Sequence, residues 1–96
     1  MVRLAYPPFD VLVTEVAGDV VAIEDACNHA GASLSEGYVT RGGACIACPM
    51  HGYVFELKTG KLLEPRGLCG DQRTFAVTRE GSDVLIWDPA SGLVIG

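Results

Sequence analysis

Short apolar runs separated by turn-forming residues are the feature that most constrains the fold of this 96-residue chain. Residues 11–16 and 20–24 flank a Gly-Asp turn, and residues 74–79 and 84–87 flank a Gly-Ser-Asp turn. Runs of this length, rich in β-branched residues, predict strands joined as hairpins. The sequence therefore predicts an all-β fold, an antiparallel sandwich or barrel.

The middle of the chain continues this pattern. Residues 38–40, 44–48 and 53–57 are expected to be short strands, and residues 64–73 form a loop rich in glycine, proline and charge. A short helix is expected at most over residues 32–36. We find no internal repeat and no linker, so residues 1–96 are expected to form a single domain.

The charge balance disfavours two classes of partner. The chain has 7 Lys and Arg against 12 Asp and Glu, a net charge of −5. An acidic surface of this kind is poorly suited to nucleic acid or to an anionic membrane surface. No apolar run approaches the ~18 residues of a membrane-spanning helix, and no signal-peptide segment is present. We expect a cytoplasmic protein.

Two loops each combine one cysteine with one histidine. The first reads Cys27-Asn28-His29, the second reads Cys48-Pro49-Met50-His51, and the chain has no other histidine. The segment between them is long enough for a strand, a turn and a returning strand that bring the loops together. In a reducing compartment, cysteines near histidines favour metal binding over disulfides.

Two kinds of metal centre use two cysteines and two histidines. Zinc binds such a set tetrahedrally, usually with cysteine paired to cysteine and histidine paired to histidine in sequence. A Rieske-type [2Fe–2S] centre has two cysteines on one iron and two histidines on the other. Here each loop mixes the two ligand types, which favours the binuclear centre and leaves a zinc structural module as the alternative.

The pair C-x-H and C-x-x-H resembles the Rieske iron–sulfur signature. Residues 48–61 are similar to Rieske ferredoxins and to the Rieske domains of ring-hydroxylating oxygenases, and Gly31 and Gly52 match the glycines that follow each histidine. The resemblance covers residues 11–87. It implies a Rieske-type antiparallel β-sandwich or barrel with a small cluster-binding subdomain of hairpin loops over about residues 26–66.

The resemblance also implies the cofactor and its ligands. One [2Fe–2S] cluster would bind per chain, with Cys27 and Cys48 on the inner iron and His29 and His51 on the outer iron near the surface. Leu34 and Met50 would supply apolar cover. Residues 65–67 match a proline-containing loop that shields the cluster in related proteins. Rieske ferredoxins often begin with a further strand, so the sheet is expected to be incomplete before residue 11 or completed by residues 91–96.

Three positions depart from the high-potential Rieske proteins. Those proteins carry a disulfide between the loops where this chain has Ala32 and Met50, and a serine that donates to a bridging sulfide where it has Tyr53. Fewer donors and an acidic chain stabilise the reduced cluster less. We expect a potential in the lower part of the Rieske range of roughly −150 to +300 mV.

The remaining cysteines and a carboxylate pair invite other interpretations. Cys45 forms a C-x-x-C with Cys48, but strand alternation would turn their side chains to opposite faces, so Cys45 is expected to be a small buried residue. Cys69 is expected to be a free thiol. Glu24 and Asp25 would likewise face opposite ways and form no general acid–base pair.

The function implied is one-electron transfer without catalysis on a substrate. By resemblance, a flavin-dependent NAD(P)H reductase would donate the electron and a terminal oxygenase would accept it, through transient contacts made by a monomer. The alternative is an electron-transfer subunit or domain of a larger oxidoreductase, such as an oxygenase or a nitrite reductase.

Overall fold

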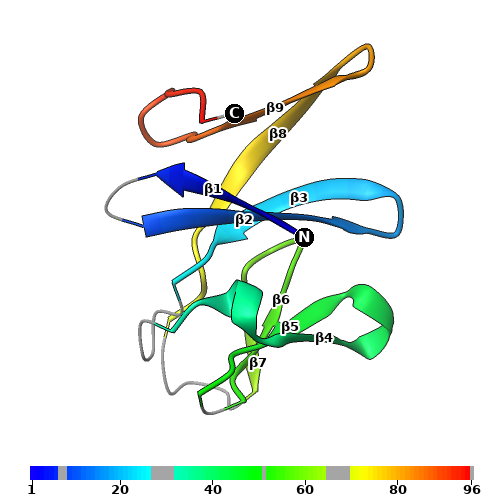
Figure 1. Ribbon diagram of the computed structural model, residues 1–96, viewed down its shortest axis with the longest axis vertical. Helices are drawn as coiled ribbons and strands as arrows, with labels where there is room; N and C mark the ends of the chain where they lie inside the picture. Colours follow the sequence, from blue (N-terminus) through cyan, green and yellow to red (C-terminus); the bar gives the residue numbers. More distant parts are fainter. Residues whose placement is uncertain (7–8, 27–31, 51, 65–69, 96) are drawn as a thin grey trace.

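Two antiparallel sheets make up the fold of the computed structural model, which describes residues 1–6, 9–26, 32–50, 52–64 and 70–95. They lie one above the other in Figure 1. The larger sheet has the order β1-β2-β3-β8-β9, with β1 (Val2–Tyr6), β2 (Phe9–Val16), β3 (Asp19–Glu24), β8 (Thr74–Glu80) and β9 (Asp83–Trp87). The smaller has the order β4-β5-β6-β7, with β4 (Tyr38–Thr40), β5 (Cys45–Ala47), β6 (Val54–Glu56) and β7 (Leu62–Glu64). Two short 3₁₀ helices, η1 (Leu34–Glu36) and η2 (Arg41–Gly43), complete the described elements.

The predicted all-β antiparallel architecture is confirmed. The β2–β3 and β8–β9 hairpins occur where the turn signals placed them, and every strand pair in both sheets is antiparallel. The weak helix signal over residues 32–36 corresponds to η1. Strand β7 was not predicted. Its first two residues stand directly before the loop expected over residues 64–73, and its last residue, Glu64, falls within that loop.

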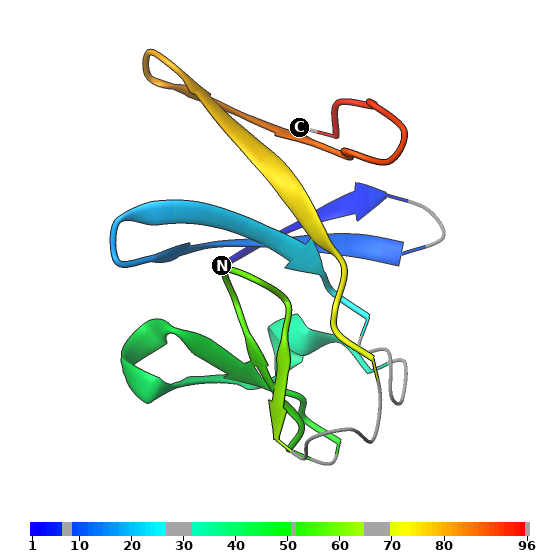
Figure 2. The ribbon, with the colours of Figure 1, turned by 180° about the vertical axis from the view of Figure 1, so that it is seen from behind.

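The expectation of an incomplete larger sheet is wrong. Strand β1 pairs with β2 along its whole length, from Val2 opposite Val13 to Tyr6 opposite Phe9. The C-terminal segment adds to the opposite edge, as the alternative expectation stated: Val94 forms a bridge with Trp87. Figure 2 shows this segment turning back along β9.

The main core lies between the two sheets. Successive residues of a strand point to opposite faces, so alternate positions of β2, β3, β5 and β6 face the gap between the sheets. The buried residues of this core are Leu12, Val16, Ile23, Leu34, Ile46, Cys48, Tyr53, Phe55, Leu57 and Leu62. Burial of a large apolar side chain stabilises a fold by about 1.5–3 kcal/mol, so this core fixes the smaller sheet against the larger one.

A second core fills the other face of the larger sheet, around Val11, Ala22, Phe75 and Ile86. Beside it, the buried carboxylate of Asp88 joins strands that are distant in sequence.

Asp88 accepts a hydrogen bond from the Tyr6 hydroxyl at 2.8 Å and from the Ala90 N–H at 2.9 Å, and it pairs with Arg73. The Arg73 guanidinium also lies 5.0 Å from the centre of the Phe75 ring. These contacts tie β1 to the ends of β8 and β9.

Acid should weaken this tie. Burial alone would raise the pKa of Asp88, but hydrogen bonds from Arg73 and Tyr6 outweigh it and lower the pKa from 3.8 to about 2. The ionised carboxylate therefore stabilises the fold fully above pH 3.8, and this contribution is lost as the pH falls toward 2. We expect Asp88→Asn to reduce the free energy of unfolding at pH 7 and the deficit to shrink near pH 2, measured by urea unfolding and circular dichroism. An equal deficit at both pH values would contradict this.

Gly60 should tolerate no side chain. Its φ is +75°, and a Cβ there would lie 2.1 Å from the Gln72 carbonyl oxygen. Gly18 has a similar φ of +85°, but a Cβ added there would meet no atom within 4 Å, so Gly18 is a matched control. We expect Gly18→Ala to cost about 1–2 kcal/mol of unfolding free energy from backbone strain, and Gly60→Ala to cost clearly more. Equal losses in urea unfolding would show that the contact with Gln72 can relax.

Candidate metal centre

The structure describes one of the four predicted ligands. Cys48 lies in the described part of the chain, whereas Cys27, His29 and His51 lie outside the described residues. Gly31, residues 65–67 and Cys69 also lie outside them. Cys48 and the residues that flank the predicted loops are the described part of the site.

Cys48 stands where β5 ends and the second loop begins. Its side chain is buried, at 1% exposure. The Cys48 N–H donates to the Tyr53 carbonyl at 2.8 Å, and the Gly52 N–H donates to the Cys48 carbonyl at 3.0 Å. Gly52 has a φ of +69°, in the left-handed region that glycine adopts readily. These bonds hold the two ends of the loop together, which fixes the direction in which Cys48 enters it.

The C-x-x-C pair is split between two environments, as strand alternation predicted. Cys45 packs with Ala47 and Val54 on one side of the smaller sheet, whereas Cys48 belongs to the core between the sheets. Both carry free thiols. Cys45 is buried at 2% exposure, which confirms its expected role as a small core residue.

The two residues expected to give apolar cover differ in exposure. Leu34 is fully buried in the same core as Cys48 and Tyr53. Met50 is 59% exposed, so it presents its side chain to solvent at the second loop. Leu34 follows the first loop and Cys48 begins the second, so one apolar core brings the flanks of the two predicted ligand loops together.

The base of the first loop is also closed by backbone contacts. Ala26 and Ser33, which flank the loop, pair as an antiparallel bridge. The Leu34 N–H donates to the Asp25 carbonyl at 2.7 Å. The chain therefore leaves β3 and returns to η1 through a narrow base.

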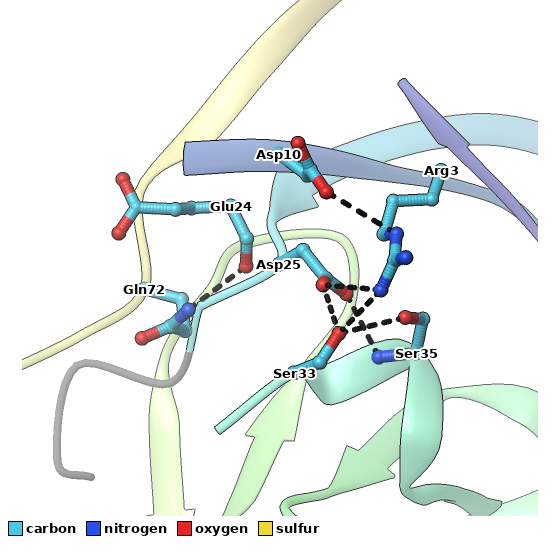
Figure 3. Close-up of polar contacts among 7 residues, drawn as sticks. All are labelled: Arg3, Asp10, Glu24, Asp25, Ser33, Ser35 and Gln72. Carbon is cyan, nitrogen blue, oxygen red and sulfur yellow. Dashed lines mark hydrogen bonds and ion pairs between the residues drawn. The ribbon is translucent and has the colours of Figure 1, made fainter. Parts of the chain in front are cut away.

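The buried carboxylate of Asp25 strengthens this closure, as Figure 3 shows. It accepts hydrogen bonds from the Ser33 hydroxyl and, at 2.8 Å, from the Ser35 N–H. Arg3 of β1 lies 3.8 Å from the same carboxylate and 3.2 Å from that of Asp10. A buried carboxylate needs such partners because desolvation of an unpaired charge is costly. Arg3 was not predicted as part of the site, since its approach depends on the unpredicted strand β1.

The side chains of Glu24 and Asp25 face opposite ways, as expected (Figure 3). Gln72 lies on the Glu24 side and contacts the backbone there. The Gln72 side-chain nitrogen donates to the carbonyls of Glu24 at 2.9 Å and Ala26 at 2.8 Å. Burial raises the pKa of Glu24, and the charge of Arg73 partly offsets this. Sequence reasoning missed Gln72, because nothing in a polar residue within a loop segment signals that it will be buried.

The geometry fits a site shared by two loops. A buried thiol begins one loop, both loop bases are closed by hydrogen bonds, and the flanks of the loops share a core. Two thiolates and two imidazoles are the ligand set of a Rieske-type [2Fe–2S] centre. Within the described ranges alone, no group of three or more His, Cys, Asp or Glu side chains is arranged to bind a metal ion.

Among the residues that the structure describes, no helix is long and apolar enough to cross a membrane.

Comparisons with known proteins give a consistent result. Residues 7–76 match the family described as the Rieske [2Fe-2S] domain. The ferredoxin component of biphenyl 2,3-dioxygenase from Rhodococcus jostii is 38% identical over 86 residues, which cover 90% of this chain and 78% of that protein.

Two solved structures share the fold. A chain in the complex of reduced oxygenase and oxidized ferredoxin in carbazole 1,9a-dioxygenase has a TM-score of 0.78 and 30% identity, covering 88% of this chain and 77% of that one. The terminal oxygenase of carbazole 1,9a-dioxygenase from Novosphingobium has a TM-score of 0.77 and 30% identity, covering 91% of this chain and 25% of that one. The family match, the identity to the biphenyl 2,3-dioxygenase component and the shared fold show that this chain belongs to the Rieske [2Fe-2S] family and binds a [2Fe–2S] cluster.

Proposed function

We propose that this chain is a Rieske ferredoxin, a one-electron carrier that serves a ring-hydroxylating dioxygenase. The observation that carries the proposal is that the C-x-H and C-x-x-H loops fall inside the family match over residues 7–76. The identity to a dioxygenase ferredoxin component supports the same role. In this proposal residues 1–96 form one domain, with the cluster-binding subdomain over about residues 26–66.

The ligands in this proposal are Cys27 and Cys48 on the inner iron and His29 and His51 on the outer iron. When bound, the cluster supplies a centre that accepts and releases one electron. Burial of Cys48 supports the assignment of the cysteines to the inner iron. The exposed side chain of Met50, which precedes His51 in the sequence, supports an exit point for the electron at the surface of the second loop.

The chain in this proposal is not itself an enzyme. Both histidines are assigned to the cluster, which leaves neither as a general base. The relative from Rhodococcus jostii is the ferredoxin component of biphenyl 2,3-dioxygenase, which supports a carrier role. Substrate chemistry would then take place on the partner.

The proposed partners are a flavin-dependent NAD(P)H reductase, which donates electrons, and a terminal oxygenase, which accepts them. A structural relative comes from a complex of an oxygenase with a ferredoxin, which supports the second partner. We propose that the chain is a cytoplasmic monomer whose contacts with both are small and transient. Its net charge of −5 suits a partner with a basic docking surface.

A second candidate is a stable subunit or domain of a larger oxidoreductase. The similarity to 25% of the chain of a terminal oxygenase of carbazole 1,9a-dioxygenase, with a TM-score of 0.77, favours this candidate. Co-purification with a large subunit at constant stoichiometry would support this candidate. A monomer that passes electrons to a separately purified oxygenase would support the ferredoxin.

The first test is metal and sulfide analysis of anaerobically purified protein, with electron paramagnetic resonance after dithionite reduction. We expect about two irons and two acid-labile sulfides per chain, and a rhombic signal with an average g below 2. Stoichiometric zinc without sulfide would overturn electron transfer as the function.

The two described cysteines provide a matched pair of variants. We expect Cys48→Ser to abolish stable cluster binding, because it removes a thiolate from the inner iron. Cys45→Ser changes the same atom in a buried residue on the other side of the sheet, and we expect it to keep about two irons and two sulfides per chain. Iron, sulfide and visible absorbance measure both. Cluster loss in both variants alike would contradict the ligand assignment.

The reduction potential follows from the residues that would surround the cluster. Tyr53 and Met50 stand where high-potential relatives have a donating serine and a disulfide cysteine, and the chain is acidic. We expect a midpoint potential in the lower part of the Rieske range of roughly −150 to +300 mV, measured by redox titration. A value near the upper end would contradict this argument.

A further inference from the structure

Gln72 makes an unusual contact for a loop residue. It is buried at 3% exposure, and its side-chain nitrogen donates to two carbonyls, those of Glu24 and Ala26. An amide NH₂ has two hydrogens, so both are used at normal hydrogen-bond distances. Figure 3 shows Gln72 beside the end of β3, on the side of the chain opposite to the Asp25 carboxylate.

The backbone of Gln72 is anchored to a different part of the fold. Its N–H donates to the Gly60 carbonyl at 2.7 Å, and the Gly60 N–H donates to the Glu56 carbonyl at 2.8 Å. Just before Gln72, the Asp71 carboxylate accepts a hydrogen bond from the Leu62 N–H at 2.9 Å. Gln72 is therefore held by the turn between β6 and β7, and β6 is the strand that leaves the second loop.

These contacts make Gln72 a direct polar link between the two loops. Through its backbone it is fixed to the hairpin that follows the second loop, and through its side chain it holds the last described residues before Cys27. The Ala26 carbonyl belongs to the planar peptide that leads into Cys27. A hydrogen bond that fixes this carbonyl fixes the point from which the first loop starts.

One backbone bond supports this link: the Glu24 N–H donates to the Arg73 carbonyl at 2.8 Å, but it lies before Asp25 and Ala26 and does not hold the carbonyl that leads into Cys27. Among the described residues, the remaining contacts near the site do not join the two loop bases by directed polar bonds. Asp25 binds Ser33 and Ser35, so it closes the first loop on itself. The apolar core brings Leu34 near Cys48, but apolar packing has no directional preference and allows small shifts. Hydrogen bonds depend strongly on distance and angle, so the two bonds from Gln72 set the position of one loop base against the other.

We propose that Gln72 is a positioning residue for the cluster: it holds the first ligand loop in register with the second. The inference rests on the ligand set given in the proposed function. Each loop contributes one ligand to each iron in that set, so a shift of one loop relative to the other distorts the coordination geometry of both irons. Without the two bonds from Gln72, the end of β3 would keep its backbone bond to Arg73 but lose the contact that holds the Ala26 carbonyl, so the start of the first loop would sample a range of positions.

The test compares cluster-loaded wild-type protein with Gln72→Met and Asp71→Asn. Methionine has a similar length and packs well in buried sites, but it cannot donate to the two carbonyls. Asp71→Asn alters the adjacent residue but keeps a side-chain oxygen that can accept from the Leu62 N–H, so the anchor of Gln72 and its two bonds toward the first loop are preserved. We expect Gln72→Met to broaden the g features of the reduced cluster, because the geometry of the cluster would then vary from one molecule to the next. We also expect this variant to lose its cluster about 10-fold faster than the wild type in the presence of a chelator. Asp71→Asn should resemble the wild type in both measurements.

Gln72→Leu serves as a second donor-free variant of different shape and should behave as Gln72→Met does, so the result does not depend on one variant folding well. A lower melting temperature with wild-type line widths and cluster-loss rates in both variants would overturn the proposal, because Gln72 would then be only structural. Equal effects of Asp71→Asn would also overturn it. If the wild type itself lacks two irons and two sulfides per chain, the proposed function fails instead, and this result is separate from the comparison of variants.

Discussion

The core between the two sheets is the interaction on which the rest of the structure depends. The larger sheet is held together by its own strand pairing, but the smaller sheet has three-residue strands that bury little on their own. Packing of Phe55 and Ile46 against Leu12 and Ile23 gives the smaller sheet a fixed place. The ligand loops leave from the margins of this core, so their geometry is set by packing that involves no ligand.

The fold was predictable where the sequence signals are local. Turn residues located both long hairpins, and the two-residue period of a strand separated Cys45 from Cys48 correctly. Strand β1 escaped prediction because its partner, β2, and not its own short sequence, makes it a strand. The family was recognisable from the spacing of the two Cys-His loops, which fall inside the family match over residues 7–76.

The polar contacts around the loops could not be predicted in the same way. Arg3, Asp25 and Gln72 are distant in sequence and meet only after the sheets have formed. Their residue types are common on protein surfaces, and burial is decided by the tertiary structure. A motif identifies the atoms that would touch the metal, whereas the residues that hold those atoms in place are visible only in three dimensions.

The separation of Cys45 from Cys48 also bears on how the cluster is put into the protein. During assembly, iron in solution binds any accessible thiolate, and a second cysteine three residues away would be a strong competitor. Strand alternation places the Cys45 thiol on the far side of the smaller sheet, among Ala47 and Val54, away from the core between the sheets that the flanks of both loops share. With the ligand set proposed above, folding of the sheet before cluster insertion would turn the Cys45 thiol away from both ligand loops, and the fidelity of assembly would depend on the order of these two events.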